Sequence, residues 1–334
     1  MNNKIYKVMI PDAMYSNPDI EEVVLRDRAK VILHNATKVS DISDSDWQSC
    51  DAVIVYDNLR YDKYLLDKLQ QCKIIARAGI GYDIIDLEEA KKKGIIVCNV
   101  PDYCVEEVAD HTIALLLALV RNIVDFSEDV RDHKWPRTST LTFRLKGKTM
   151  GIIGFGRIGM LTALRAKSFG LNIVFYDPYL REGYDKVLDV KRCYSLKEIA
   201  ELSDIVSVHT PLTDETYNLI DDNFFSFLKK EIILLNTARG GIINISALFK
   251  AMKESKVLAC GVDVLPQEPL DKTVPLLKDY INNEKWIKGR LIVTPHTAFY
   301  SHEALKELRK KASEEVLRVL NNKPGRNCVN NFYV

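Results

Sequence analysis

The 334-residue sequence lacks the features that mark secreted, metal-stapled and membrane-spanning chains. Its seven cysteines include no C-x-x-C pair, and their odd number leaves one thiol outside any disulfide scheme. This pattern is typical of reduced thiols in the cytoplasm and argues against a structural zinc site. The most apolar stretch, from Ile113 to Val120, is far shorter than the ~20 residues that a membrane-spanning helix needs. We therefore expect a soluble, cytoplasmic protein with no membrane partner.

The sequence also lacks an excess of charge of either sign. It has 47 Lys and Arg residues against 46 Asp and Glu residues, a formal net charge of +1. Such a chain creates no broad field that would attract nucleic acid, so we expect no nucleic-acid partner. Because ~100–200 residues is usual for one domain, the length predicts two domains, and 47% hydrophobic residues can fill their cores.

Short apolar runs alternate with helical segments in the first hundred residues. Between the runs, residues 64–71 and 87–93 have the pattern of helices, the second of them ended by Gly94. Strands that alternate with helices predict parallel βαβ units covered on both faces. The predicted strands cover residues 7–10, 30–34, 52–56, 73–76 and 95–100.

Pro101 interrupts this alternation, and one long helix is predicted from about residue 105 to residue 130. From Lys148 the alternation starts again, and a polar helix at residues 303–321 ends it. Six strands with helices between them match the count of a doubly wound dinucleotide-binding domain. These strands are predicted at residues 149–153, 172–176, 205–209, 232–236, 258–262 and 291–294.

A glycine turn, G-x-G-x-x-G at residues 154–159, follows the first of these strands. The spacing alone is common, but here a strand leads into the turn and an apolar-periodic helix leaves it at Ile158. Gly154 permits the tight turn, Gly156 lets the backbone approach a pyrophosphate, and Gly159 lets the helix pack closely on the strand. Because N–H groups and the helix dipole favour anions at a helix N-terminus, the turn predicts a bound dinucleotide.

Asp177 ends the next predicted strand, close to the ~20 residues after the turn where a ribose-binding carboxylate is expected. A carboxylate there accepts hydrogen bonds from the adenosine ribose and repels a 2′-phosphate. Two alternatives stay open: Arg181 nearby could accept a 2′-phosphate, and a strand-end Asp can simply cap the next segment. We predict NAD as the cofactor, in preference to NADP.

Arg239, Glu268 and His296 follow the ends of strands predicted in the second half. The carboxyl ends of parallel strands lie at one edge of a sheet, so these side chains should reach one crevice. His296 can exchange a hydroxyl proton at neutral pH, and Glu268 beside it would stabilise the imidazolium. Arg239 can bind a carboxylate in bidentate geometry and polarise a carbonyl oxygen. The trio predicts hydride transfer to a carbonyl or from an alcohol.

Each of these residues alone would more often be a loop, surface or core side chain. Their joint position downstream of a dinucleotide turn favours the catalytic interpretation. No H-x-x-x-H pair or cysteine cluster supplies metal ligands, so no metal is expected. His209, at a strand end, is expected to line the cofactor pocket. The remaining histidines are predicted to lie away from the crevice: His34, His111, His133 and His302.

Several longer motifs run in order along the chain. They are AGIGYDIID at residues 78–86, the glycine turn, NTARGG at 236–241, GVDV at 261–264 with Glu268-Pro269, and Thr294-Pro295-His296. Together they resemble the D-isomer-specific 2-hydroxyacid dehydrogenase family over essentially the whole chain. The resemblance implies hydride transfer between NAD(H) and a small, anionic D-2-hydroxyacid or 2-keto acid, with Arg239, Glu268 and His296 as the catalytic residues.

The resemblance also implies how cofactor and substrate are held. Asp263 would help to hold the nicotinamide end, and the backbone amides of the Ala78–Gly79 turn would hold the substrate carboxylate. Arg77 would add a cation there, with an ordinary surface arginine as the alternative. The predicted substrate contacts are Arg77, Ala78, Gly79, Tyr103 and Arg239. The predicted cofactor contacts are Gly154, Gly156, Arg157, Ile158, Gly159, Asp177, Pro178, His209, Thr210, Pro211, Thr216, Thr237, Ala238, Asp263 and His296.

The implied architecture is an α/β fold of two Rossmann-like, doubly wound parallel domains. Residues 1–102 and 297–334 would form a flavodoxin-like substrate (catalytic) domain, and residues 103–296 an NAD-binding Rossmann domain inserted within it. This order agrees with the fresh start of the alternation after Pro101. Family members usually form homodimers through the long helix that follows, here the segment from Ile113 to Val120.

Other members of the family remain as alternatives. Residues 175–180 and 327–330 look most like the C-terminal binding protein branch, so an NAD(H)-sensing corepressor-like scaffold is a second hypothesis. That branch has a Trp soon after the catalytic histidine, where this chain has Phe299, and it usually has extended tails, which we do not expect here. D-3-phosphoglycerate dehydrogenase shares the core motifs. Formate, phosphite, glyoxylate and hydroxypyruvate specificities depend on pocket residues that the motifs do not determine.

Overall fold

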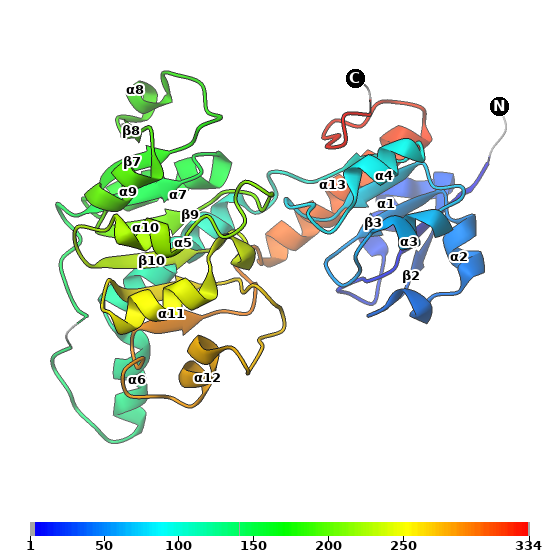
Figure 1. Cartoon of the computed structure of the whole chain (residues 1–334). Coiled ribbons are helices and arrows are strands. Elements are labelled where there is room, and N and C mark those ends of the chain that lie inside the picture. Colours follow the sequence, from blue (N-terminus) through cyan, green and yellow to red (C-terminus); the bar gives the residue numbers. More distant parts are fainter. Residues whose placement is uncertain (1–3, 140, 333–334) are drawn as a thin grey trace. The chain divides into compact units, whose positions relative to one another are not determined.

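The computed structural model describes residues 4–139 and 141–332, and it divides the chain into two compact units. The first unit runs up to Tyr103 and resumes at Ser301, and the second spans Cys104–Tyr300 (Figure 1). Each unit contains a parallel sheet with helices packed on it, which confirms the predicted α/β class with two doubly wound sheets. Across the described ranges, no helix has the length and apolar character that would let it cross a membrane.

The first unit is built on a five-stranded sheet in the flavodoxin-like order β2-β1-β3-β4-β5. β3 and β4 lie in its interior and are buried along their whole length, so their sequences are nearly continuous apolar runs. The strands are β1 (Tyr6–Ile10), β2 (Ala29–Leu33), β3 (Ala52–Val55), β4 (Ile74–Arg77) and β5 (Ile96–Cys98).

Helices from both ends of the chain cover this sheet. α2 (Asp44–Ser49), α3 (Lys63–Lys68) and α4 (Leu87–Lys92) contribute Trp47, Leu65 and Ala90 to one buried cluster. The C-terminal α13 (His302–Leu320) packs on α1 (Asp19–Leu25) and on β3 and β4. The buried Arg309–Glu21 ion pair, with Nη2 to Oε2 at 2.6 Å, joins α13 to α1. The C-terminal segment is therefore an integral part of the first unit.

The second unit contains a seven-stranded parallel sheet in the order β12-β11-β10-β9-β6-β7-β8. The direction of strand succession reverses between β6 and β9, the position where open parallel sheets bind ligands. The prediction of six strands is wrong by one, because β8 is a short and partly polar edge strand. The strands are β6 (Thr149–Ile153), β7 (Asn172–Tyr176), β8 (Lys191–Cys193), β9 (Ile205–Val208), β10 (Ile232–Asn236), β11 (Val257–Val262) and β12 (Leu291–Val293).

Helices cover both faces of this second sheet. Successive side chains of β10 point to opposite faces and pack against the helices on each. Ile233 and Leu235 pack with α5 (Val105–Val120) and α7 (Arg157–Lys167). Ile232 and Leu234 pack on the opposite face. The helices of that face are α9 (Leu196–Leu202), α10 (Asp222–Ser226), α11 (Ile245–Lys253) and α12 (Pro275–Ile281), and the short α8 (Tyr184–Leu188) follows β7.

The single helix predicted for residues 105–130 is wrong. Asn122 has a φ of +53°, in the left-handed region, and separates α5 from α6 (Ile123–Arg131). Asparagine adopts this conformation more readily than other residues with a side chain, so it can end a helix where neither Pro nor Gly is present.

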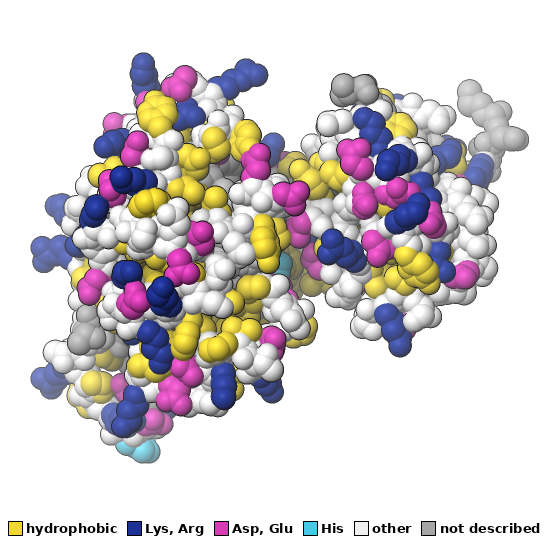
Figure 2. Space-filling view, in the orientation of Figure 1, with side chains coloured by type: hydrophobic (Ala, Val, Ile, Leu, Met, Phe, Trp, Pro, Cys, Tyr) yellow, Lys and Arg dark blue, Asp and Glu magenta, His cyan; other side chains and the backbone are white. Residues whose placement is uncertain are grey.

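The visible surface agrees with the near-zero net charge. On the face shown in Figure 2, Lys and Arg side chains are intermixed with Asp and Glu side chains on each unit. Neither unit presents on this face a broad field of one sign that would favour a polyanionic partner.

Candidate active site

The glycine turn joins β6 to α7, beside the point where the sheet order reverses. Gly154 has a φ of +89°, and a Cβ there would lie 2.7 Å from the His209 carbonyl carbon after β9. A Cβ on Gly159 would collide with the Gly154 carbonyl oxygen, whereas one on Gly156 would meet nothing within 4 Å. The turn is therefore tightly packed on its protein side, while Gly156 borders open space at the N-terminus of α7. A pyrophosphate requires such a space.

The loop after β9 carries four predicted cofactor contacts, His209, Thr210, Pro211 and Thr216. The Thr216 hydroxyl donates to the Pro211 carbonyl oxygen at 2.6 Å and so holds the turn of this loop. The Thr210 hydroxyl is buried and has no hydrogen-bond partner among the described residues. Because buried hydroxyls are nearly always partnered, an orphan beside the glycine turn fits a bound group that completes it.

His209 presents a neutral ring in this loop. Burial lowers its pKa to about 4. One ring nitrogen, Nε2, lies 2.8 Å from the Ser207 hydroxyl. His209 therefore carries no charge at neutral pH.

Asp177 follows β7, and its carboxylate accepts backbone hydrogen bonds from two loops. Oδ2 accepts from the Phe155 N–H at 2.9 Å, and Oδ1 accepts from Tyr179 N–H at 3.0 Å and Leu180 N–H at 3.2 Å. The carboxylate thus ties the strand end to the glycine turn, and a ribose contact there stays a prediction. The neighbouring predicted contacts are Arg157 and Ile158 at the start of α7 and Pro178 after the strand.

His296 and Glu268 form a hydrogen-bonded pair. His296 lies in the loop after β12, and its Nδ1 is 2.7 Å from Oε2 of Glu268, in the loop after β11. Burial acts to raise the pKa of Glu268, but hydrogen bonds from His296 and from the Leu265 N–H, with the nearby Arg239 charge, lower that pKa overall. Glu268 is therefore a carboxylate at neutral pH, and it accepts a hydrogen bond from the Nδ1–H group of His296.

Arg239 lies in the loop after β10, which the side chain of Asn236 supports. The Asn236 amide donates to the Arg239 carbonyl oxygen at 2.9 Å, and its oxygen accepts from Ala238 N–H at 3.0 Å. Asn236 is thus a bracing residue that the strand-end argument did not select. Its signal in the sequence was an entirely apolar run that ends in an amide side chain.

The Arg239 loop packs directly on the loop that leads to Glu268. A Cβ on Gly240 would collide with the backbone of Leu265 and Pro266. The structure therefore brings the three predicted catalytic residues into one region, because the Arg239 charge acts on Glu268 and Glu268 contacts His296.

Asp263 is buried after β11 and fixes the loop that carries His296. Its Oδ1 accepts hydrogen bonds from the Thr294 hydroxyl at 2.6 Å and from Thr297 N–H at 2.9 Å. Its Oδ2 accepts from Ala298 N–H at 2.8 Å. The expected contact with the nicotinamide end stays a prediction, whereas these three contacts hold the loop itself.

His111 was expected to lie away from this region, and that prediction is wrong. It lies on α5, with Nε2 2.9 Å from Oγ1 of Thr294 and 3.7 Å from Oδ1 of Asp263. The next residue, Thr112, has its hydroxyl 2.8 Å from that of Thr237, one of the predicted cofactor contacts. Two adjacent polar residues at the start of the chain's most apolar segment were the available signal.

In the first unit, Arg77 ends β4, and the alternative of a surface arginine is wrong because its side chain is buried. Its guanidinium donates to the Gly81 carbonyl oxygen at 2.8 Å, contacts the Ala78 carbonyl oxygen, and forms an ion pair with Asp57. Arg77 thus supports the turn from the protein side.

The two amides expected to hold a carboxylate have protein partners in this structure. Ala78 N–H donates to the Val55 carbonyl oxygen at 2.8 Å and so extends the sheet, and Gly79 N–H donates to the Arg77 carbonyl oxygen at 2.9 Å. A substrate contact at this turn would require one of these bonds to be exchanged. Tyr103, the remaining predicted substrate contact, is buried.

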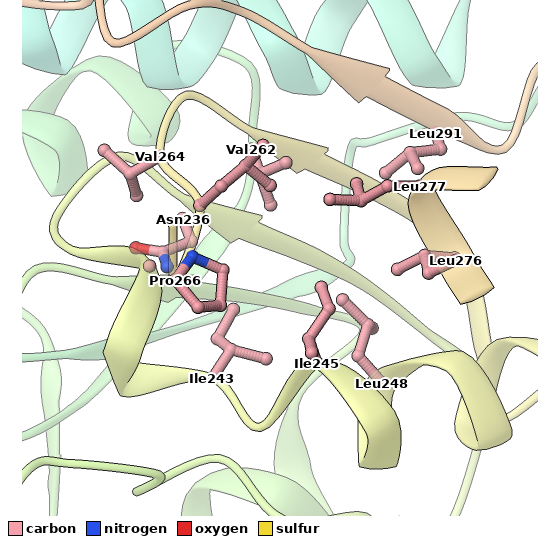
Figure 3. A pocket seen from close by; sticks show the side chains of 12 residues that line it. Asn236, Ile243, Ile245, Leu248, Val262, Val264, Pro266, Leu276, Leu277 and Leu291 are labelled. Carbon is pink, nitrogen blue, oxygen red and sulfur yellow. The ribbon is translucent and has the colours of Figure 1, made fainter. Parts of the chain in front are cut away.

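A small cavity lies between β10, β11, α11 and α12 (Figure 3). Its volume is about 10 Å³, and it is lined mainly by aliphatic side chains such as Leu248 and Leu276, with the amide of Asn236. This space holds about one water molecule, so it is a packing gap and not a ligand site. Within the described residues, no group of three or more His, Cys, Asp and Glu side chains is placed to hold a metal ion.

Comparison with known proteins shows one consistent relationship. The family described as D-isomer specific 2-hydroxyacid dehydrogenase, NAD binding domain, matches residues 113–298. A glyoxylate reductase of Korarchaeum cryptofilum is 37% identical over 274 residues, 81% of this chain and 80% of that relative. A D-3-phosphoglycerate dehydrogenase of Methanocaldococcus jannaschii is 36% identical over 283 residues, 85% of this chain but only 52% of that relative.

The structural comparison agrees. The crystal structure of D-lactate dehydrogenase from Aquifex aeolicus, in complex with NAD and lactic acid, superimposes with a TM-score of 0.82 at 28% identity. The superposition covers 94% of this chain and 96% of that one.

Proposed function

The chain belongs to the D-isomer specific 2-hydroxyacid dehydrogenase family, and on that premise we propose that it transfers a hydride between NAD(H) and a small D-2-hydroxyacid or 2-keto acid. It is an NAD-dependent oxidoreductase of this family, with NAD as cofactor. The observation that carries the proposal is the 2.7 Å contact between His296 and Glu268, within reach of the Arg239 charge.

His296, Glu268 and Arg239 have different roles in the proposed reaction. His296 exchanges the hydroxyl proton of the substrate, and the Glu268 carboxylate stabilises the imidazolium. Arg239 binds the substrate carboxylate and polarises the carbonyl oxygen. NAD, when bound, supplies or accepts the hydride.

The cofactor contacts follow from the glycine turn and the strand ends. The N–H groups at the start of α7, next to Gly156, hold the pyrophosphate, and Asp177 accepts hydrogen bonds from the adenosine ribose. The orphan Thr210 hydroxyl gains its missing partner from the bound dinucleotide. Asp263 lies near the nicotinamide end.

A panel of substrates tests the proposal. NADH oxidation is measured with glyoxylate, pyruvate and hydroxypyruvate, and NAD reduction with the matching D-2-hydroxyacids. D-3-phosphoglycerate belongs in the panel as a second candidate, since a phosphoglycerate dehydrogenase is 36% identical to this chain. If NADH binds tightly and no substrate turns over, the enzyme proposal fails in favour of an NAD(H)-sensing scaffold.

We propose that the protein forms a homodimer through the region of α5, with exposed apolar side chains of the following helix in the interface. Ile113, Leu116 and Leu119 are buried in the core of their own unit. The exposed apolar side chains lie just beyond α5, including Ile123 and Val130 on α6. Light scattering should therefore give the mass of a dimer, and Ile123→Asp with Val130→Asp should shift it towards the monomer.

A further inference from the structure

We propose that His111 and Thr294 are positioning residues for His296, joined to it through Asp263 as a brace between α5 and the His296 loop. The inference rests on the proposed role of His296 as the proton-exchanging group. All four residues belong to the second unit.

The backbone around His296 shows why a brace is needed. His296 has a φ of +53°, in the left-handed region, which a residue with a Cβ adopts only when its surroundings impose it. Its N–H donates to the Asp263 carbonyl oxygen at 2.8 Å. The same nitrogen also lies 3.0 Å from the Thr294 carbonyl oxygen. The Asp263 carboxylate adds bonds from Thr297 N–H and Ala298 N–H on the other side of His296.

Proton counting fixes the direction of the bonds in this brace. The Thr294 hydroxyl has one proton, and it donates that proton to Asp263 Oδ1 at 2.6 Å. Its oxygen can then only accept from His111 Nε2, which lies 2.9 Å away. His111 must therefore carry a proton on Nε2, and an acceptor at that position would leave the Thr294 oxygen without its donor.

Helix α5 also contacts the loop that carries Arg239. Thr112 donates its hydroxyl proton to the Val108 carbonyl oxygen at 2.8 Å, as is usual within a helix. It therefore accepts from the Thr237 hydroxyl, two residues before Arg239. Consecutive residues of α5 thus contact the loops that carry His296 and Arg239, so α5 sets the spacing between the two loops.

Two matched pairs of variants test the brace. Thr294→Val removes the hydroxyl at nearly constant volume, and Thr294→Ser keeps it. His111→Asn places an amide N–H near the position of Nδ1, and His111→Gln places one near that of Nε2. Because a misplaced catalytic group costs on the order of tenfold or more, we expect Thr294→Val and His111→Asn to lower kcat to that extent. KM for NADH should change by less than about twofold, and Ser and Gln should restore the rate.

A spectroscopic measurement does not depend on turnover. In ¹⁵N-histidine spectra of the whole protein, His111 should show the Nε2–H form, and Thr294→Val should change the ring signals of His296 more than Thr294→Ser does. If His111 carries its proton only on Nδ1, the brace is wrong.

The outcomes separate this inference from the proposed function. If His296→Ala is inactive while the two members of each matched pair have equal kcat, the brace is refuted and the function stands. If His296→Ala stays active, the proposed role of His296 fails, and the spectra alone then decide whether the brace exists.

Discussion

Gly240 packs so closely on Leu265 that a single added methyl group would collide with the Leu265 carbonyl group. Because the opposing atoms belong to the backbone, they cannot rotate away, and Gly240→Ala should displace the Arg239 loop. We expect kcat with a 2-keto acid to fall by on the order of a hundredfold, while circular dichroism shows an intact fold. Gly241→Ala is the matched control, since the atoms nearest to its Cβ would be side-chain atoms of one leucine and one tyrosine, at 3.3 Å or more. Equal rates for both variants would contradict the loop contact.

His296→Ala should abolish turnover and leave NADH binding nearly unchanged, because the imidazole exchanges a proton with the substrate. Glu268→Gln should retain an acceptor for the Nδ1 proton and lose the charge that stabilises the imidazolium. We therefore expect a partial loss, on the order of tenfold in kcat/KM for keto-acid reduction. Steady-state kinetics and NADH fluorescence titration measure both effects. An active His296→Ala protein would overturn its assignment.

Asp177→Asn should weaken NADH binding more than NADPH binding. The amide keeps one oxygen for the backbone N–H groups that Asp177 binds, but it removes the charge that repels a 2′-phosphate. We expect the ratio of the two Kd values to shift by on the order of tenfold, and fluorescence titration with each nucleotide measures it. If both affinities fall equally, Asp177 only holds its loop and does not bind the ribose hydroxyls.

The parts of the fold and the site that could be predicted are those that local pattern determines. Strands such as β10 were predictable because a strand buried on both faces of a sheet is a continuous apolar run. Arg239, Glu268 and His296 were predictable because the carboxyl ends of parallel strands lie at one edge of the sheet. The edge strand β8 was not predictable, because its three residues include two basic ones and resemble a loop.

Other features depend on tertiary contacts that no short pattern contains. His111 meets Thr294 across 183 positions of sequence, and only the packing of α5 on the sheet brings them together. A surface position was one alternative for Arg77, but its side chain is buried and donates to the Gly81 carbonyl oxygen in the turn that follows. The end of α5 at Asn122 depends on one left-handed residue, a weak signal beside the apolar periodicity around it.

Arg309→Met should destabilise the first unit strongly, because Glu21 is completely buried and would lose the guanidinium that neutralises it. Breaking a buried ion pair from one side costs about 3–5 kcal/mol in the free energy of unfolding. The matched control is the double variant with Glu21→Gln, which removes the uncompensated charge and should recover part of the loss. Urea unfolding of the two proteins and the wild type provides the measurement, and a double variant no more stable than Arg309→Met would refute the explanation.

His209 should make the protein less stable in mild acid. Burial lowers its pKa from the ordinary 6.5 to about 4, so the unfolded chain binds a proton in a range where the folded one does not. The contribution of His209 to the free energy of unfolding is therefore fully present above pH 6.5. It decreases as the pH falls below that value and reaches its lower limit below pH 4. His209→Asn does not titrate, so between pH 7 and about pH 4.5 the wild type should lose about 2–3 kcal/mol more in the free energy of unfolding. Urea unfolding at several pH values tests this: the other titrating groups are common to both proteins, and parallel curves would mean that the folded protein accommodates the charged ring.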